Sequence, residues 1–259
     1  MSAPDAGAPA ILLDLDGTLI DTVEVWHTAY VRLAAELGLR APDDLWPQVA
    51  GRNMQASLDV FGSAIAGADR DVLVHRLVAL AADHLANPPS VDAPGWRWLA
   101  GARELLTLLR SARTPTDHGS VEGSPPVAVA LVTSAWRAFT LPLLHRALDG
   151  PDVVAATFDA IVCGDEVRHG KPAPDSYLRA AELLGRSPAQ CLVIEDSPTG
   201  VAAADAAGMV SLVVPHAGPV PAHPGRSIRG DLTGLTLCAL TTLHTGLRSA
   251  TERAEQRST

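Results

Sequence analysis

The stretch AILLDLDGT, residues 10–18, decides the fold of this chain. Residues 10–13 are all apolar, which predicts a short strand buried on both faces of a sheet. Asp14 and Asp16 are two positions apart, so an extended backbone projects both carboxylates to the same side. Gly17 then ends the strand and lets the chain turn. The pattern predicts two acids at the edge of a sheet.

Further apolar runs predict the other strands of this sheet, and helical stretches alternate with them. The strands are expected at Val127–Val132, Ala160–Cys163, Cys191–Ile194 and Val210–Val214. The helices are expected at Trp98–Arg110, Ala138–Leu148, Ser176–Leu184 and Val201–Ala207. This alternation predicts an α/β fold with a doubly wound parallel sheet, a Rossmann-like core. In such sheets, ligands bind beyond the carboxyl ends of the strands.

One region after the first strand breaks this alternation. From about Asp21 to Ala93 no convincing strand occurs, and the apolar residues repeat with helical spacing. The clearest stripe consists of Trp26, Tyr30, Leu33 and Leu37. We therefore expect an all-helical domain inserted into the α/β core.

These patterns divide the chain into three expected parts. The discontinuous α/β core takes residues 1–20 and 95–250, and the helical insertion takes residues 21–94. The end, 251–259, is predicted to be a frayed helix end or a tail. The polar segment 111–126 is rich in Pro, Gly, Ser and Thr, which is typical of a solvated connection.

The composition argues against several classes of protein. A formal charge of −9 over 259 residues disfavours a nucleic-acid partner or an anionic membrane. No apolar run is long enough to span a bilayer, and Met1–Pro9 lacks the features of a secretory signal. Cys163, Cys191 and Cys238 are an odd number, which suggests buried thiols in a reducing compartment. We expect a cytoplasmic protein, monomeric or homodimeric.

Lys171 is the only lysine in a chain that otherwise uses arginine for positive charge. A lysine ammonium is a compact donor of three hydrogen bonds, which a guanidinium does not replace. Pro172 and Pro174 stiffen the loop around it, just before a predicted helix. We expect Lys171 to supply positive charge at the edge of the sheet where the acids lie.

Glu195 and Asp196 follow another buried strand. Ser197 suits the N-cap of the next helix, Pro198 its first position and Gly208 its exit. Acidic residues before a helix can be purely structural, because their negative charge stabilises the helix dipole. They also fit a cluster with the two aspartates of the first strand.

Such a cluster is costly unless cations share it. Each pair of carboxylates at about 5 Å costs roughly 3 kcal/mol at an effective dielectric near 20. A hard divalent ion with oxygen ligands, Mg²⁺, answers that need. The predicted metal-binding residues are Asp14, Asp16, Glu195 and Asp196.

The residue types at this edge suit the transfer of a phosphoryl group. A carboxylate can attack phosphorus to form an aspartyl-phosphate, while a second carboxyl protonates the departing oxygen. Thr133 and Ser134 end the strand 127–132, where a hydroxyl and free backbone amides would hold a phosphoryl oxygen.

These motifs, in this order and at these spacings, resemble the haloacid dehalogenase superfamily, in its β-phosphoglucomutase-like branch with a helical cap. The resemblance extends from Ile11 to about Pro215. It implies that Asp14 is the nucleophile and that Asp16 is the general acid and base. Because dehalogenases and phosphonatases of the superfamily lack the second aspartate, cleavage of carbon–halogen or carbon–phosphorus bonds is disfavoured.

The resemblance also implies roles for the other motifs. Thr133 and Lys171 would hold the phosphoryl oxygens. Asp196 would bind Mg²⁺ with Glu195 at or behind the metal shell, and Asp16 would offer its backbone carbonyl to the ion.

The same resemblance leaves a choice between phosphatase and mutase. The mutases carry a cap histidine that would align with Trp26, and His27 lies on a different helix face. They hold a second phosphate with a serine and a lysine where this chain has Ala135 and Trp136. Thr18 is also more typical of phosphatases. We therefore expect a phosphatase of a small phosphorylated metabolite, a sugar phosphate. The alternatives are a β-phosphoglucomutase and a catalytically idle protein that binds a phosphometabolite.

Substrate selection is expected from the cap. The sequence Gly51-Arg52-Asn53 resembles the loop that reaches the substrate in this branch, so Arg52 would meet a hydroxyl or a second anion. A solvent-exposed arginine at a helix start is the alternative. Trp26 is expected to pack in the core, and the loop histidine His169 receives no role.

Overall fold

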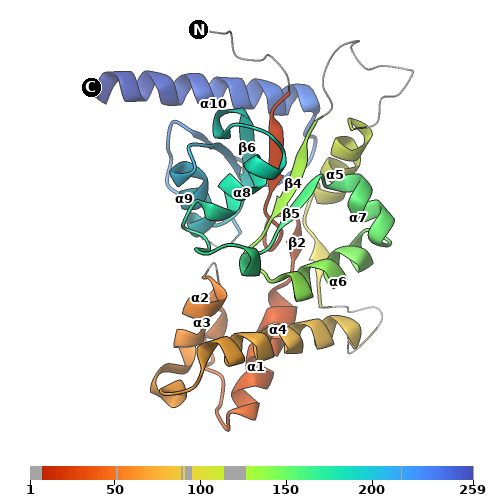
Figure 1. The fold of residues 1–259 in the computed structure, drawn as a ribbon, viewed down its shortest axis with the longest axis vertical. Helices are drawn as coiled ribbons and strands as arrows, with labels where there is room; N and C mark the ends of the chain where they lie inside the picture. The colour runs from red at the N-terminus through yellow and green to blue at the C-terminus, as the bar shows by residue number, and fades with distance from the viewer. Residues whose placement is uncertain are drawn as a thin grey trace.

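The protein, described here from a computed structural model over residues 8–50, 52–88, 90, 95–113, 127–216 and 218–258, is built on one parallel sheet (Figure 1). The strand order is β5-β4-β1-β6-β7-β8, and each neighbouring pair is parallel. The strands are β1 (Ala10–Leu13), β4 (Val129–Val132), β5 (Ala160–Val162), β6 (Cys191–Glu195), β7 (Val210–Val213) and β8 (Arg226–Ile228). The predicted doubly wound α/β fold is confirmed.

Helices cover both faces of the sheet, so its strands are buried on both sides. Along β1, Ile11 and Leu13 belong to one apolar cluster, whereas Ala10 and Leu12 belong to the other. The first face is covered by α5 (Ala102–Ser111), α6 (Arg137–Ala147), α7 (Pro151–Thr157) and α10 (Leu237–Ser258). The second face is covered by α8 (Asp175–Leu183) and α9 (Pro198–Ala206). Continuous apolar strands are the sequence pattern that burial on both faces requires.

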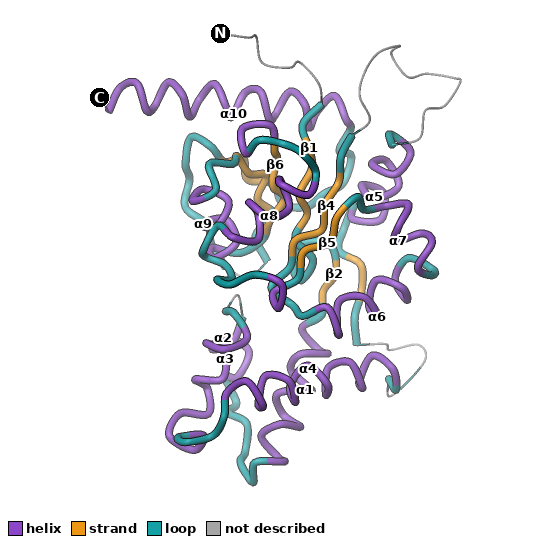
Figure 2. Tube along the Cα trace, in the orientation of Figure 1, coloured by secondary structure: helices purple, strands orange, loops and turns teal. Residues whose placement is uncertain are grey.

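A second group of helices lies beyond the carboxyl ends of the strands (Figure 1). The chain leaves the sheet through β2 (Ile20–Asp21) and returns through β3 (Arg97–Trp98), and these two strands pair antiparallel. The helices between them, here called the cap helices, are α1 (Val23–Glu36), α2 (Leu45–Val49), α3 (Met54–Ser57) and α4 (Arg70–Ala86), with a 3₁₀ segment at Leu58–Ile65. Figure 2 shows helix and loop in this group. Apolar faces of α1 and α4 pack on each other.

Several local predictions were wrong at the edges of elements. Trp98 lies in β3 and not at the start of a helix, because it pairs with Ile20. Several elements were not predicted. The helix α7 and the strands β2, β3 and β8 are short, β8 has no apolar run, and most of the long helix α10 was also missed. The segment 251–259 was predicted to be a frayed helix end or a tail, and it continues α10 as far as Ser258. Of the predicted solvated segment 111–126, residues 114–126 lie outside the described residues.

Two further expectations concern the burial of the cysteines and the lack of a membrane-spanning segment. Cys163 and Cys191 are buried free thiols, as predicted, whereas the prediction of burial was wrong for Cys238, which is exposed in the first turn of α10. Among the described helices, even the 22-residue α10 lacks the apolar length that a membrane span requires.

Candidate active site

Asp14 and Asp16 lie where β1 ends, at the centre of the sheet. The backbone N–H of Asp14 still donates to Ile194 O (3.0 Å), so the strand pairing carries its buried carboxylate to the edge. Gly17 turns the chain with a φ of 87°, and a Cβ there would lie 2.4 Å from Asp196 Oδ2. Only glycine tolerates both this backbone conformation and this approach. The turn therefore brings the end of β1 against the end of β6.

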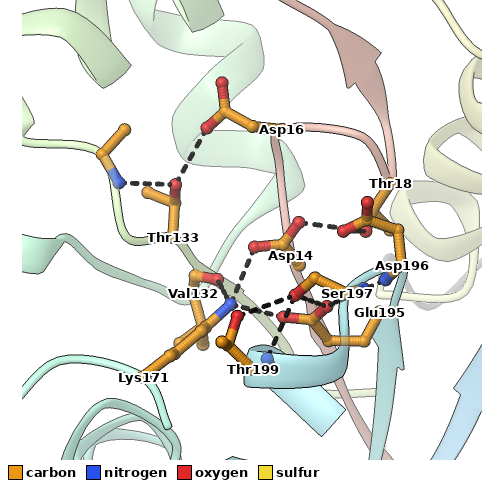
Figure 3. A network of polar contacts seen from close by, with 12 residues as sticks. Asp14, Asp16, Thr18, Val132, Thr133, Lys171, Glu195, Asp196, Ser197 and Thr199 are labelled. Atoms are coloured by element: carbon orange, nitrogen blue, oxygen red, sulfur yellow. Dashed lines mark hydrogen bonds and ion pairs between the residues drawn. The ribbon is translucent and has the colours of Figure 1, made fainter. Parts of the chain in front are cut away.

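Lys171 is buried at the centre of a polar network (Figure 3). Its Nζ donates to Asp14 Oδ1 (2.7 Å), Glu195 Oε1 (2.7 Å) and the backbone carbonyl of Val132 (3.0 Å). All three donor positions of the ammonium are thus used. The single lysine of the chain holds together the ends of β1, β4 and β6.

Glu195 is the last residue of β6 and is fully buried. Its Oε2 accepts from Asp196 N (2.8 Å), Ser197 N (2.9 Å) and Ser197 Oγ (3.0 Å). Its Oε1 accepts from Tyr177 OH (3.1 Å) in addition to the lysine. A Cβ on Gly200 would lie 1.6 Å from Oε1, so this glycine makes room for the carboxylate. Sequence reasoning missed Tyr177 and Gly200, because their role appears only when α8 and α9 are packed.

Asp14, Glu195 and Asp196 offer carboxylate oxygens that lie within 4.8 Å of one another. Thr18 joins two of these acids, because its Oγ1 lies 3.0 Å from Asp14 Oδ2 and 3.5 Å from Asp196 Oδ1. Lys171 is the one buried cation among the described residues that line the site. A hard cation with oxygen ligands fits a donor set of this kind.

The pKa of Asp14 also favours a cation beside its carboxylate. Burial raises the pKa of Asp14 to about 7; Lys171 opposes this rise, and the negative charge of Glu195 adds to it. Burial also acts to raise the pKa of Glu195, but the charge and hydrogen bond of Lys171, together with the hydrogen bonds from Ser197, hold this pKa below its usual range. A second cation beside Asp14 would favour its ionised form.

The carboxylate of Asp16 points away from Lys171, toward Thr133 (Figure 3). Its Oδ1 accepts from Thr22 Oγ1 (2.5 Å) and Trp26 Nε1 (3.2 Å), and its Oδ2 accepts from Thr133 Oγ1 (3.2 Å). Burial raises the pKa of Asp16, and these hydrogen bonds partly offset the rise. Trp26 is buried, as predicted, but it also contacts a predicted catalytic acid.

Thr133 and Ser134 follow β4 and lie in the same pocket. The backbone N–H of Thr133 donates to Val162 O (3.0 Å), and that of Ala135 donates to Thr133 Oγ1 (3.0 Å). Two of the backbone amides near this strand end, those of Thr133 and Ala135, are therefore already used within the protein. The hydroxyl of Thr133 remains beside Asp16.

These residues line one pocket of about 860 Å³, part of it open to solvent. The cap helices and the loop after α2 supply its other wall, which is largely apolar. That wall consists of Val23, Trp26, Tyr30, Trp46, Val49, Ala50, Arg52 and Met54. Sequence reasoning missed His216, which lies after β7 beside Gly17 and also lines the pocket.

Arg52, the predicted site residue on the cap, and two histidines that received no role in the sequence analysis lie at or beyond the rim of the site. Arg52 lines the pocket from the cap side and is exposed, while its neighbour Gly51 lies outside the described residues. His27 is exposed on α1. His169 binds Asp175 Oδ2 through Nδ1 (3.0 Å) at the surface, which braces the loop that carries Lys171.

Comparison with known proteins places this geometry in context. A family profile described as haloacid dehalogenase-like hydrolase matches residues 8–208. The chain is 33% identical over 197 residues to hexitol phosphatase A of Escherichia coli (strain K12), covering 76% of this chain and 78% of that protein. It is 30% identical over 200 residues to a phosphorylated carbohydrates phosphatase of Thermotoga maritima, covering 77% of this chain and 82% of that protein.

The fold is also similar to solved structures. The crystal structure of CbbY from Rhodobacter sphaeroides in complex with phosphate superposes with a TM-score of 0.71. The match covers 90% of this chain and 99% of that chain at 21% identity. At this identity the likeness supports the fold alone.

Proposed function

The chain belongs to the haloacid dehalogenase-like hydrolases, and from this premise we propose that it is a Mg²⁺-dependent phosphatase of a small phosphorylated carbohydrate. The observation that carries the proposal is the pairing of the Asp14 carboxylate with the Lys171 ammonium in a pocket that also holds Asp16. The carbohydrate half of the proposal rests on the relatives that are named as phosphatases of hexitols and of phosphorylated carbohydrates.

In the first step, a carboxylate oxygen of Asp14 attacks phosphorus. A new O–P bond forms, the bond between phosphorus and the leaving alcohol breaks, and Asp16 gives its proton to the alcohol oxygen. In the second step, water attacks the phosphorus of the aspartyl-phosphate while Asp16 takes a proton from that water. The O–P bond to Asp14 then breaks and restores the carboxylate. The Thr133 hydroxyl would donate to a phosphoryl oxygen, and Lys171 would do so by exchanging one of its three present acceptors for that oxygen.

The proposed metal ligands are the carboxylates of Asp14 and Asp196 and the backbone carbonyl of Asp16, with Glu195 at or behind the metal shell. The cluster of carboxylate oxygens and the raised pKa of Asp14 support a cation at this place. When bound, Mg²⁺ supplies positive charge for the phosphoryl oxygens. Glu195 contributes mainly by holding Lys171, because its oxygens already accept from five donors.

We further propose that residues 21–94 act as a cap that closes over the site. Closure would exclude bulk water and select the leaving group through Arg52 and its apolar neighbours. The two short strands β2 and β3, which carry both connections between the cap helices and the sheet, support a hinge at this place.

Replacement of Asp14 tests the proposal. Asp14→Asn keeps the side-chain shape and removes the nucleophile, so turnover is expected to fall by at least about 10³-fold. The assay measures phosphate release from a panel of sugar phosphates, nucleotides and glycerol phosphates, with and without Mg²⁺. Asp152→Asn, an identical change on the exposed side of α7, is the matched control and is expected to retain wild-type turnover. An Asp14→Asn protein that releases phosphate at the control rate would refute the mechanism.

The two alternatives give different products. Incubation with β-glucose 1-phosphate, Mg²⁺ and a catalytic amount of the bisphosphate yields free phosphate from a hydrolase and an isomerised hexose phosphate from a mutase. An idle binding protein would release no phosphate from any member of the panel.

A further inference from the structure

Tyr177 of α8 contacts both Glu195 and Lys171 but has no role in the two proposed steps. Its side chain is fully buried, and its hydroxyl donates to Glu195 Oε1 (3.1 Å). The Lys171 ammonium lies 4.9 Å from the centre of its ring, a distance that allows a cation–π contact. Because an ammonium donates only, the phenolic proton has Glu195 as its acceptor and not the lysine. Tyr177 and Lys171 therefore share one carboxylate oxygen.

The three acceptors of Lys171 differ in what remains when the lysine leaves them. Glu195 Oε1 keeps the hydroxyl of Tyr177, and the other oxygen of this carboxylate keeps three donors. In the described part of the chain, Asp14 Oδ1 has no other hydrogen-bond donor, and the carbonyl of Val132 has none outside the pairing of the sheet. A buried acceptor that loses its donor is costly. Glu195 Oε1 is therefore the acceptor that the lysine releases most easily.

We propose that Tyr177 is a positioning residue that lets Lys171 exchange Glu195 Oε1 for an oxygen of the bound phosphoryl group. The exchange leaves the ammonium bonded to Asp14 and Val132, so it bridges the nucleophile and the phosphoryl group. The hydroxyl of Tyr177 then satisfies Glu195 Oε1 in place of the lysine. This inference rests on the proposed function, in which Lys171 contacts a phosphoryl oxygen.

Tyr177→Phe tests the inference because it keeps the ring beside Lys171 and removes only the hydroxyl. In this variant, Glu195 Oε1 loses its last donor when the lysine turns to phosphate. The dissociation constant of inorganic phosphate, measured by calorimetry with Mg²⁺ present, is expected to rise about fivefold, the effect of one hydrogen bond of ordinary strength. KM should rise by a similar factor with kcat nearly unchanged, because the phosphoryl oxygens are held alike in the ground state and the transition state.

Tyr30→Phe is the matched control, at the other tyrosine of the chain. Tyr30 is buried like Tyr177, and its hydroxyl donates to the hydroxyl of Ser57 on the cap side. The substitution removes one buried hydrogen bond, so Tm should fall. The affinity for inorganic phosphate should stay unchanged, because this ion has no alcohol half that reaches the cap. A Tyr177→Phe protein that loses only thermal stability, as the control does, would overturn the inference.

Two further measurements do not depend on turnover. Because Lys171 is the only lysine, protein labelled with ¹⁵Nζ-lysine gives a single ammonium resonance. Inorganic phosphate is expected to shift this resonance, with a midpoint about fivefold higher in Tyr177→Phe than in the wild type. A crystal structure of the wild type with phosphate should show Nζ bonded to phosphate and Asp14 and separated from Glu195 Oε1. A resonance that phosphate does not shift, or a bound lysine that keeps Glu195, would overturn the inference.

Failure of the exchange is distinguishable from failure of the proposed function. If phosphate binds more weakly to Tyr177→Phe but no member of the panel releases phosphate, the exchange holds and the proposed function fails. If the enzyme hydrolyses members of the panel but Tyr177→Phe binds phosphate as tightly as the wild type does, the inference fails while the function stands.

Discussion

The two walls of the pocket differ in how completely their polar groups are satisfied. On the sheet side, Lys171, Asp14 and Glu195 are buried and bonded to one another. On the cap side, the wall is mostly apolar, and Arg52 is exposed and makes no ion pair in the described part of the chain. Under the proposed function, the sheet side would fix the chemistry and the cap side would adapt to the leaving group. Changes to the sheet side should therefore affect stability and turnover together, and changes to the cap side should affect substrate choice.

The largest loss of stability is expected from Lys171→Met, which removes the charge and keeps the length of the side chain. It leaves two buried carboxylates without their counter-ion, which costs about 3–5 kcal/mol when a buried pair loses one partner. Turnover should fall by at least about 10²-fold, because the phosphoryl oxygens lose a preorganised cation. Thermal unfolding and phosphate release measure the two effects.

Arg179→Met provides the control for this change. Arg179 forms an exposed ion pair with Glu182 on α8, and such pairs contribute about 0.5 kcal/mol or less. If Lys171→Met unfolded at the same temperature as this control, the buried ion pairs of the sheet side would not stabilise the protein more than an exposed pair does.

The sheet side could be predicted from the sequence because it depends on short motifs at strand ends. A strand that is apolar throughout, such as Ala10–Leu13, must lie inside a covered sheet, and the residue after it must reach the edge. Three such ends brought Asp14, Thr133 and Asp196 to one place, and the loop between β5 and α8 brought Lys171 there. Their separation along the chain did not matter, since parallel strands share one carboxyl edge.

The cap side could not be predicted to the same depth. Its helices can be predicted because apolar residues repeat with helical spacing. This spacing does not determine which side chains point toward the sheet. Trp26 lies on the apolar stripe of α1 and was expected to serve only the core, yet its N–H reaches Asp16. Tyr177 shows the same limit on the sheet side, because the packing of α8 decides where its hydroxyl points. Contacts between elements depend on packing, which no local motif records.

A smaller effect concerns the pH dependence of Mg²⁺ binding. Burial raises the pKa of Asp14 to about 7, so below this pH the ion must displace a proton from Asp14. The affinity for Mg²⁺ should therefore increase as pH rises from 6 to 8, and added Mg²⁺ should raise Tm more at pH 8 than at pH 6. Calorimetric titration of wild type and Asp14→Asn measures this, with a weaker pH dependence expected in the variant. An equal Mg²⁺ affinity at both pH values in the wild type would place the ion away from Asp14.

The smallest effect is expected on the cap side, from Arg52→Ala. Arg52 is exposed at the rim and lacks an ion pair in the described structure, so its removal should leave Tm unchanged. One hydrogen bond from a charged donor to the leaving group contributes about 1.5–3 kcal/mol, which corresponds to a rise in KM of about tenfold or more, with a small change in kcat. The effect should disappear for substrates whose alcohol half is too short to reach the cap, such as glycerol phosphate. If Arg52→Ala instead lowered kcat for every substrate alike, the cap would take part in the chemistry, and the division between the two walls would be wrong.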